Sequence, residues 1–462
     1  FTSTTSAAEP EPRPAGPAAS PAGGDDQQAT TRPAFAVGAR VLCRASFDDR
    51  EHVAEVVEVK EEYNGAEGKS YYVHYADFNK RLDEWAGAGR VRALEEGGAS
   101  PGPKDVVGTA DATTPGSGDR KMTRNFKRRY DEIHHVEKPV EELAPIDQKL
   151  EREHEEKTKV KNIQVVELGR YEMDTWYYSP YPAEYACCHK LFICEYCMKY
   201  VRTRERLAEH HAKCQRRKPP GVEIYRAPGP PSPRHSLPLS CFEVDGKEHK
   251  LYCQNLALLA KLFLDHKTCY YDSDPFNFYV VTERDERGHH PVGYFSKEKH
   301  SIEGYNLACI LTLPSYQRKG YGGFLISLSY ELSKREGKVG TPERPLSDLG
   351  QVSYRSYWMR QALAALHRHR GNLSLKELSE ITCIRVEDIV STLQHLNVIK
   401  YWKGQHIITA SPRVIEDHVR SLSPGGKKPL EVLADCLRWE APSQPSAKKG
   451  RSGGTKPSGS GK

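Results

Sequence analysis

Three cysteines and one histidine occur at a spacing that suits a metal ion: Cys194-x2-Cys197-x12-His210-x3-Cys214. Thiolate sulfur and imidazole nitrogen are ligands that tetrahedral Zn²⁺ prefers. The first cysteine pair fits a tight turn, and His210 and Cys214 share one face of a helix because they lie four residues apart. All four positions are filled by the protein, so we predict a structural zinc site. His211 is an adjacent alternative ligand, while Cys187 and Cys188 fall outside the pattern.

A glycine-rich turn follows an apolar run in residues 306–326, which read NLACILTLPSYQRKGYGGFLI. The apolar run Leu307–Leu313 has the length of a strand, and an apolar helical pattern follows the turn. Strand, glycine turn and helix together present backbone N–H groups to a phosphate at a helix N-terminus. Arg318 and Lys319 add positive charge at the turn. Taken alone, such a turn is also compatible with a plain tight connection.

The turn, with Cys309 in the preceding strand, resembles the acetyl-CoA-binding segment of the MYST family of lysine acetyltransferases, in particular the males-absent-on-the-first (MOF) type. The resemblance covers roughly residues 160–440 and a separate stretch near residues 35–95. It implies an α+β fold with a GCN5-related acetyltransferase-like core, a zinc finger and a winged-helix-like C-terminal part. It also implies a small β chromo-barrel ahead of that core, acetyl-CoA as co-substrate, and His210 as the histidine ligand of the structural zinc.

The same resemblance implies which residues contact acetyl-CoA. They lie on the strand, the glycine turn and the helices beyond it: Ile310, Thr312, Gln317, Arg318, Lys319, Gly320, Gly322, Gly323, Ser347 and Ser356. Gly323 replaces the lysine that is usual in the family, which implies one phosphate contact fewer and weaker binding. Lys267 stands where the family has an auto-acetylated lysine, and the alternative is an ordinary lysine near a helix end.

Glu343 stands between Pro342 and Pro345, on a segment that the prolines make rigid. A lysine ammonium has a pKa of ~10.4 and must lose its proton before it attacks a thioester. A glutamate whose pKa is raised by burial can take that proton, directly or through water. In the MYST family this position is the general base, so the resemblance implies that role for Glu343. The alternative is a solvated surface carboxylate, which is the commoner role of a glutamate.

Cys309 has three interpretations. Its thiolate could take the acetyl group and pass it on, or it could line the pocket while lysine attacks acetyl-CoA directly. It could also be a buried core cysteine. We favour direct attack, with Cys309 near the acetyl group.

Several elements must position these residues. We expect helices at Leu256–Asp265, Phe324–Arg335 and 353–369, and strands at Phe276–Thr282 and Pro291–Phe295, around the strand that contains Cys309. After them, helices Leu373–Glu380 and Val386–Leu396 and a hairpin at Val398–Ile408 predict a winged-helix-like part. Such a part could contact DNA through its basic wing. We favour a packing role, because the second helix is not basic.

The N-terminal part predicts short strands near Val41–Cys43, His52–Val59 and Tyr71–Tyr75, with a hairpin turn at Asn64-Gly65. The segment Tyr72–Trp85 resembles the chromo-barrel (Tudor-knot) signature. Its aromatic residues could form a cage for a methylated lysine, and they are Tyr72, Tyr75, Phe78 and Trp85. We favour the alternative, that most of them fill the barrel core. Lys80 and Arg81 leave RNA or DNA binding open.

The chain has 462 residues, 37% of them hydrophobic, and a formal net charge of +6. No apolar run approaches the ~20 residues that span a bilayer, and no apolar signal segment is present, so we expect no membrane contact. The twelve cysteines are therefore expected to be reduced thiols, metal ligands or catalytic groups. The predicted parts are a disordered tail (1–32), the chromo-barrel (33–95), a basic linker (96–160), the MYST domain (161–440) with its zinc finger at 192–217, and a disordered basic tail (441–462).

Together these features predict a nuclear, chromatin-associated histone acetyltransferase. The family resemblance favours the tail of histone four as acceptor, and implies nucleosomes and scaffold subunits of chromatin complexes as partners. The basic run Arg120–Arg129 is interpreted as a nuclear-import signal or a nucleic-acid patch. One alternative is a non-catalytic chromatin-binding scaffold, which the presence of both Cys309 and Glu343 disfavours. A cysteine hydrolase is another, and it lacks an evident partner histidine.

Overall fold

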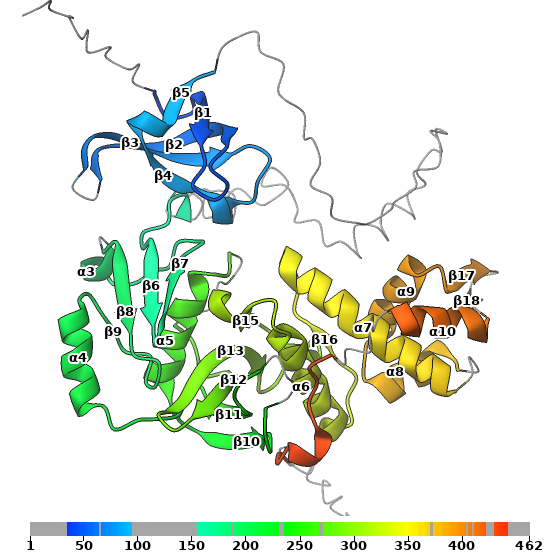
Figure 1. The fold of residues 1–462 in the computed structure, drawn as a ribbon. Coiled ribbons are helices and arrows are strands. Elements are labelled where there is room, and N and C mark those ends of the chain that lie inside the picture. Colours follow the sequence, from blue (N-terminus) through cyan, green and yellow to red (C-terminus); the bar gives the residue numbers. More distant parts are fainter. Residues whose placement is uncertain are drawn as a thin grey trace, which may run out of the picture.

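The computed structural model describes residues 35–63, 66–94, 156, 158–186, 188–230, 235–265, 267, 271–369, 373–402, 405–408, 411–421 and 429–441. The tail predicted for residues 1–32, the basic run Arg120–Arg129, the Asn64-Gly65 turn and nearly all of the tail predicted for 441–462 lie outside these residues. Within the described part, no helix is both long and apolar enough to cross a membrane. The predicted α+β class is confirmed, with sheets and helices throughout (Figure 1).

A five-stranded antiparallel barrel-like sheet forms the N-terminal part, with strand order β4-β3-β2-β1-β5. Its strands are β1 (Arg40–Arg44), β2 (Glu51–Tyr63), β3 (Ala66–Tyr75), β4 (Glu84–Gly87) and β5 (Val91–Ala93). A 3₁₀ turn, Lys80–Leu82, connects β3 to β4. Successive side chains of a strand point to opposite faces, and Tyr71, Val73 and Tyr75 of β3 accordingly enter the barrel core.

The four aromatic residues considered for a cage do not come together. Tyr72 packs against Trp85, with ring centroids 5.3 Å apart, whereas Tyr75 packs with Phe47 and Phe78. Tyr72 and Tyr75 lie three residues apart on one strand, so they point to opposite faces of the sheet. Both are buried, but only Tyr75 belongs to the barrel core cluster, with Phe78 packed against it. The favoured core interpretation therefore holds for two of the four residues, while Tyr72 and Trp85 pair on the other face.

The next part is a four-stranded sheet of order β7-β6-β8-β9 with two helices beside it (Figure 1). Its elements are β6 (Val165–Leu168), β7 (Tyr171–Asp174), α3 (Ala183–Ala186), β8 (Lys190–Ile193), β9 (Tyr200–Val201) and α4 (Arg204–Lys213). Thr203 caps the N-terminus of α4 and accepts a hydrogen bond from the Arg206 amide.

A second five-stranded antiparallel sheet, of order β10-β11-β12-β13-β15, forms the centre of the molecule. Its strands are β10 (Val222–Arg226), β11 (Leu239–Asp245), β12 (Phe276–Asp285), β13 (Gly288–Glu298) and β15 (Ile310–Thr312). Two short parallel strands, β14 (Tyr305–Leu307) and β16 (Thr341–Pro342), lie next to it.

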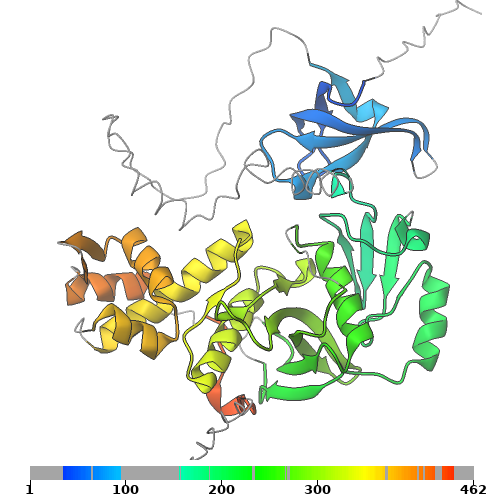
Figure 2. The ribbon, with the colours of Figure 1, turned by 180° about the vertical axis from the view of Figure 1, so that it is seen from behind.

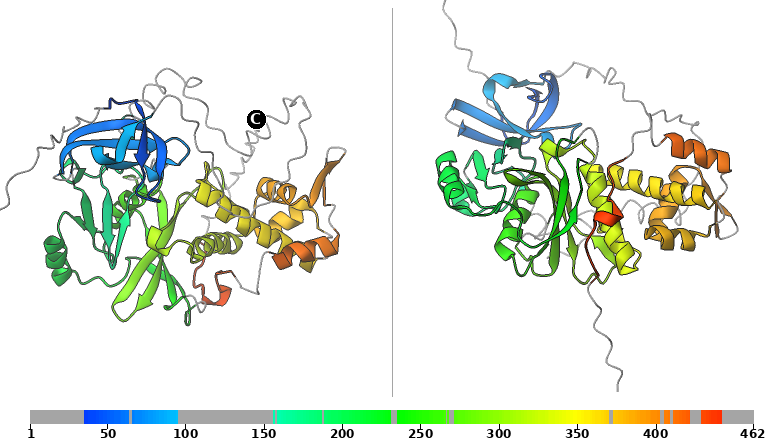
Figure 3. Two further views of the ribbon diagram at one scale, coloured as in Figure 1. Left: turned by 45° about the horizontal axis from the view of Figure 1, so that its top comes forward. Right: turned by 60° about the horizontal axis from the view of Figure 1, so that its bottom comes forward.

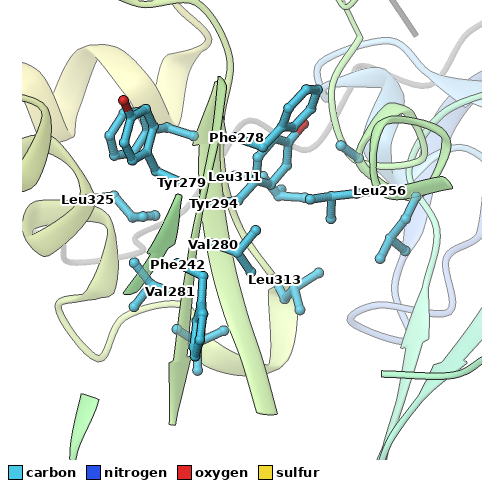
Figure 4. Packing of buried hydrophobic residues seen from close by; sticks show 14 of the residues in the cluster. Phe242, Leu256, Phe278, Tyr279, Val280, Val281, Tyr294, Leu311, Leu313 and Leu325 are labelled. Carbon is cyan, nitrogen blue, oxygen red and sulfur yellow. The ribbon is translucent and has the colours of Figure 1, made fainter. Parts of the chain in front are cut away.

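Two helices cover the two faces of the central sheet, α5 (Lys250–Lys261) and α6 (Tyr321–Glu336). The strands are apolar on both faces, as expected for a sheet that is covered on both sides. Figure 4 shows Phe278 and Leu256 on one face, and Tyr279 and Leu325 on the other. Gly320 begins α6 with a left-handed φ of 98°, which favours glycine at this position.

The C-terminal part packs against α6 through a second hydrophobic cluster. It contains α7 (Asp348–Arg368), α8 (Leu375–Thr382), α9 (Val386–His395), β17 (Ile399–Trp402), β18 (Gln405–Ile408) and α10 (Pro412–Ser421). Two helices followed by a hairpin confirm the winged-helix-like order. Ile389 and Leu393 on α9 are buried, which agrees with the favoured packing role.

The last described segment, residues 429–441, returns to the central sheet and runs beside α6 (Figure 2). The amide of Arg438 donates to the carbonyl oxygen of Ile224 over 2.6 Å, and Leu437 forms a β-bridge with Tyr225 on β10. Near the start of the segment, the Val432 amide donates to Ser327 Oγ over 3.0 Å.

Several predicted bounds were wrong. The helix expected at Leu256–Asp265 is α5 and begins at Lys250, because its first turn is amphipathic rather than apolar, with Leu251 exposed. The helix expected from Phe324 begins at Tyr321, and the one expected from residue 353 begins at Asp348, where Ser347 provides the cap. Apolar patterns missed these polar or glycine-rich first turns.

Candidate active site

Cys309 lies at a break between two strands and not inside one, which corrects the prediction of a continuous strand over Leu307–Leu313. β14 ends at Leu307 and pairs with β16, while β15 begins at Ile310 and pairs with β13. At the break, the Ser296 amide donates to the Cys309 carbonyl oxygen over 2.8 Å, and the Cys309 amide donates to Ser296 Oγ over 3.2 Å. The chain changes partner strands here, so the side chain of Cys309 can line a cavity.

Glu343 follows β16 directly, and its amide donates to the carbonyl oxygen of Leu307 over 2.8 Å. Since β14 and β16 run parallel, the residues that follow them emerge at the same edge. Burial and the nearby Glu298 carboxylate raise the pKa of Glu343, while Lys267 opposes this shift. A carboxyl group with a raised pKa is a suitable proton acceptor near neutral pH.

Lys267 brings an amine to the same place. Its Nζ donates to Cys309 Sγ over 3.5 Å, and the residue is only 7% exposed. Within the described part of the chain, neither an imidazole nor a carboxylate lies at hydrogen-bond distance from Cys309 Sγ.

Cys309, Glu343 and Lys267 line one cavity of about 930 Å³. Six of the residues predicted to contact acetyl-CoA line it as well: Ile310, Thr312, Gln317, Arg318, Gly322 and Ser347. A drug-sized ligand occupies a cavity of about 300–1,000 Å³, so this cavity has room for the reactive end of acetyl-CoA and an acceptor side chain.

The other four predicted contacts lie beside the cavity and not on its wall. Lys319 and Gly320 are exposed in the turn before α6, and Gly323 lies in its first turn. Ser356 lies in the middle of α7, where its hydroxyl oxygen accepts a hydrogen bond from Arg360 over 2.8 Å.

The start of α6 offers an anion-binding arrangement at one end of the cavity. No side chain caps this helix, and Arg318 and Gly320 both have left-handed φ values, of 61° and 98°. The first N–H groups of a helix have no partner within it and attract anions. Arg318 lines the cavity at this point. The turn therefore offers N–H donors and positive charge to an anion at this end of the cavity.

Several lining residues were not predicted. Ser353 is one of them, and it lies one helical turn before Ser356 on the same face of α7. Helical spacing from Ser356 could therefore have identified it in the sequence. Tyr177, Asn79 and Arg81 also line the cavity, and no local pattern pointed to them. They meet because the barrel lies next to the sheet of β6 to β9 (Figure 3). Between these two parts, Tyr177 Oη donates to Asn79 Oδ1 over 3.2 Å.

The predicted zinc ligands form a cluster. One donor atom from each of Cys194, Cys197, His210 and Cys214 lies within 4.8 Å of the others. Cys197 Sγ and His210 Nε2 are 3.2 Å apart. The two cysteines from the β8–β9 turn face the end of α4, where His210 is followed by Cys214 as the C-cap. Three thiols and one imidazole with no open position fit a structural Zn²⁺, and His211 is not part of the cluster.

Comparisons with known proteins agree with this architecture. Residues 218–436 match the MOZ/SAS family, residues 160–214 the MYST family zinc finger domain, and residues 35–93 the RNA binding activity-knot of a chromodomain.

Three relatives show how far the similarity extends. Histone acetyltransferase of the MYST family 2 from Arabidopsis thaliana is 54% identical over 404 residues, covering 87% of this chain and 85% of the relative. Putative MYST-like histone acetyltransferase 1 from Oryza sativa subsp. japonica is 53% identical, covering 87% and 84%. Histone acetyltransferase MOF from Drosophila melanogaster is 44% identical, covering 85% and 51%. This chain, with its zinc cluster and its cavity between Cys309 and Glu343, belongs to the MYST family of histone acetyltransferases.

Proposed function

We propose that Glu343 is the general base of a histone acetyltransferase reaction in which the acceptor lysine attacks acetyl-CoA directly. The observation that carries this proposal is the position of the Glu343 carboxyl group. It follows β16 at the edge where Cys309 follows β14, it lines the same cavity, and burial raises its pKa.

In this reaction acetyl-CoA supplies the acetyl group as a thioester. Glu343 takes a proton from the acceptor ammonium, directly or through a water molecule, and the freed amine attacks the carbonyl carbon. The new C–N bond replaces the C–S bond of the thioester, coenzyme A leaves as a thiolate, and this thiolate takes up the second proton of the attacking amine. Arg318 and the first N–H groups of α6 hold the pyrophosphate. Cys309 lines the cavity near the acetyl group. The partner of its thiol is the Lys267 amine, and among the described residues no imidazole or carboxylate lies at hydrogen-bond distance to take the thiol proton, which supports direct attack over a covalent cysteine intermediate.

The acceptor is a histone tail, and we propose the tail of histone four as the preferred one. Four further carboxylates line the cavity and favour a basic peptide, namely Asp265, Asp272, Glu298 and Asp348. Opposite charges at a binding surface steer association and suppress wrong partners.

Lys267 is the proposed site of auto-acetylation. Its amine lies 3.5 Å from Cys309 Sγ, inside the cavity that receives the acceptor lysine. Incubation with acetyl-CoA followed by peptide mass spectrometry should find acetyl-Lys267 in the parent protein and much less of it in Glu343→Gln.

The chain acts on chromatin in the nucleus under this proposal, within a complex that includes scaffold subunits. The match of residues 35–93 to the RNA binding activity-knot supports nucleic-acid binding by the barrel. The exposed Lys80 beside the half-buried Arg81 adds positive charge on its surface.

The experiment that tests the mechanism measures acetyl transfer to histone-tail peptides across a pH series. The parent, Glu343→Gln and Cys309→Ala are compared. Loss of the general base should lower kcat by about 10²–10⁴, most strongly at lower pH, while Cys309→Ala should retain activity. Inactive Cys309→Ala would favour the covalent route, and a Glu343→Gln variant with the kcat of the parent would remove Glu343 as base.

A further inference from the structure

Asp388 connects the winged-helix-like part to the segment that carries Glu343. It lies in the first turn of α9 and is only 2% exposed. Its Oδ2 accepts a hydrogen bond from Thr341 Oγ1 over 2.6 Å, and its Oδ1 accepts one from Arg344 Nη2 over 2.6 Å. Each carboxylate oxygen of the buried Asp388 thus accepts a hydrogen bond from one of two residues that flank Glu343 in sequence.

The backbone is held from the same side. The Gly340 amide donates to the carbonyl oxygen of Cys383 over 2.9 Å, and the Arg385 amide donates to the carbonyl oxygen of Gly340 over 3.2 Å. On the other side of this segment, β16 pairs with β14. The Glu343 segment therefore lies between the strand leading to Cys309 and the start of α9.

We propose that Asp388 is a positioning residue for the acetyl-transfer reaction, because its carboxylate holds Thr341 and Arg344 and so fixes where the Glu343 carboxylate points. The inference rests on the proposed role of Glu343 as general base. A catalytic group must be held within roughly 0.5 Å of its productive place, by partners whose own positions are locked. Asp388 supplies such a lock from a part of the molecule that does not line the cavity.

Asp388 also pairs with the positive charge next to the base. Arg344 is next to Glu343 in sequence and is one of the residues that line the cavity. An unpaired guanidinium near a carboxylate lowers the pKa of that carboxylate, which would weaken a general base. The other charged or titratable groups that face Asp388 are Arg385, Tyr330 and Tyr354.

The test compares steady-state kinetics of the full chain on a histone-tail peptide. Asp388→Asn should lower kcat by about 10- to 100-fold, the effect of a small displacement of a reacting group, with the KM for acetyl-CoA within about twofold of the parent because the cofactor turn is untouched. Glu387→Gln is the matched control, since this neighbouring acid on α9 is exposed, and its kcat should equal that of the parent.

A purely structural role is separated by combining variants. In the Glu343→Gln background, Asp388→Asn should lower kcat by less than about threefold, because the carboxylate that Asp388 positions is already absent. Full multiplication of the two effects would overturn the inference, as would an Asp388→Asn variant with the kcat of the parent while Glu343→Gln is impaired. A Glu343→Gln variant with the kcat of the parent would instead remove the proposed base, and this inference with it.

Thr341 provides a milder variant in case Asp388→Asn does not fold. Thr341→Val removes the hydroxyl that Asp388 holds and should lower kcat by about 3- to 10-fold, whereas Thr341→Ser keeps the hydroxyl and should restore most of it. Equal kcat values for these two variants would also overturn the inference.

Discussion

The backbone N–H of Glu343 donates to the carbonyl oxygen of Leu307, and this hydrogen bond ties the proposed base to the strand that leads into Cys309. The two residues belong to segments that become neighbours only through the parallel pairing of β14 and β16. Reactive groups held by backbone hydrogen bonds of a sheet are placed more accurately than groups on loops.

Glu298 should influence the pH below which kcat falls. Its carboxylate raises the pKa of Glu343, and a general base works only when it is ionised. Glu298→Gln removes the repulsion, so the pKa of Glu343 should fall and the acidic limb of the kcat–pH profile should move to lower pH. Stopped assays with saturating substrates across pH 5–9 would measure the shift.

Lys267→Gln should shift the acidic limb of the kcat–pH profile in the direction opposite to Glu298→Gln. The Lys267 ammonium lowers the pKa of Glu343, so its removal should move the same limb to higher pH. Two shifts in the same direction would contradict the assignment of this limb to Glu343.

Removal of the metal should destabilise the hydrophobic core around the central sheet as well as the zinc finger. Ile193 and Met198, which flank the cysteines of the β8–β9 turn, belong to the core cluster that includes the central sheet. Chelation, or Cys197→Ser, should therefore lower the unfolding temperature by about 5–15 °C. Calorimetry with zinc quantification would measure it. Cys188→Ser, outside the cluster, is the control and should keep both the metal and the unfolding temperature.

Gly323 offers a gain-of-affinity test at the cofactor turn. A side chain at this position would meet only the Leu430 carbonyl oxygen, at 3.9 Å, which is ordinary contact. Gly323→Lys should tighten acetyl-CoA binding by about 3- to 10-fold, because it adds a cation near the phosphates. Gly323→Ala gains only helix propensity, about 1 kcal/mol of stability, and should leave the affinity unchanged. Calorimetric titration with acetyl-CoA would measure both affinities. Equal affinities of the Gly323→Lys and Gly323→Ala variants would exclude the phosphate contact.

Arg81 should influence the acceptor and not the cofactor. Its half-buried side chain lies on the cavity wall with Asp265 and Asp348, so its charge opposes a basic tail at the mouth. Arg81→Glu should lower the KM of a histone-tail peptide by about 2- to 10-fold, more at low salt, and leave the KM for acetyl-CoA unchanged. Lys80→Glu is exposed and does not line the cavity, so it serves as the control. A higher peptide KM in Arg81→Glu would mean that Arg81 contacts the acceptor instead.

Local patterns were sufficient for some of this molecule. The spacing of Cys194, Cys197, His210 and Cys214 depends on one turn and one helix, and the glycine turn before α6 depends on contiguous residues. Such signals survive folding, because neighbours in sequence remain neighbours in space.

Features that depend on distant segments could not be predicted in this way. The apolar run from Leu307 to Leu313 has one continuous pattern, yet the chain changes partner strands at Cys309. Asp388 occurs in a helical pattern where an acid is normally solvated, and it is buried in the folded chain, where it contacts the distant residues Thr341 and Arg344. The contact of Tyr177 with Asn79 joins residues that lie 98 positions apart in the sequence. The opposite faces of Tyr72 and Tyr75, in contrast, are a local feature that strand alternation predicts, and the cage hypothesis overlooked it.

The last described segment has a consequence for solubility. β10 is the outer strand of the central sheet, and Leu437 and Arg438 pair with it. An uncovered edge strand offers unpaired N–H and C=O groups to another chain. A shortened protein that ends before residue 429 would expose this edge, and it would tend to associate edge to edge and precipitate even with every residue of the cavity in place.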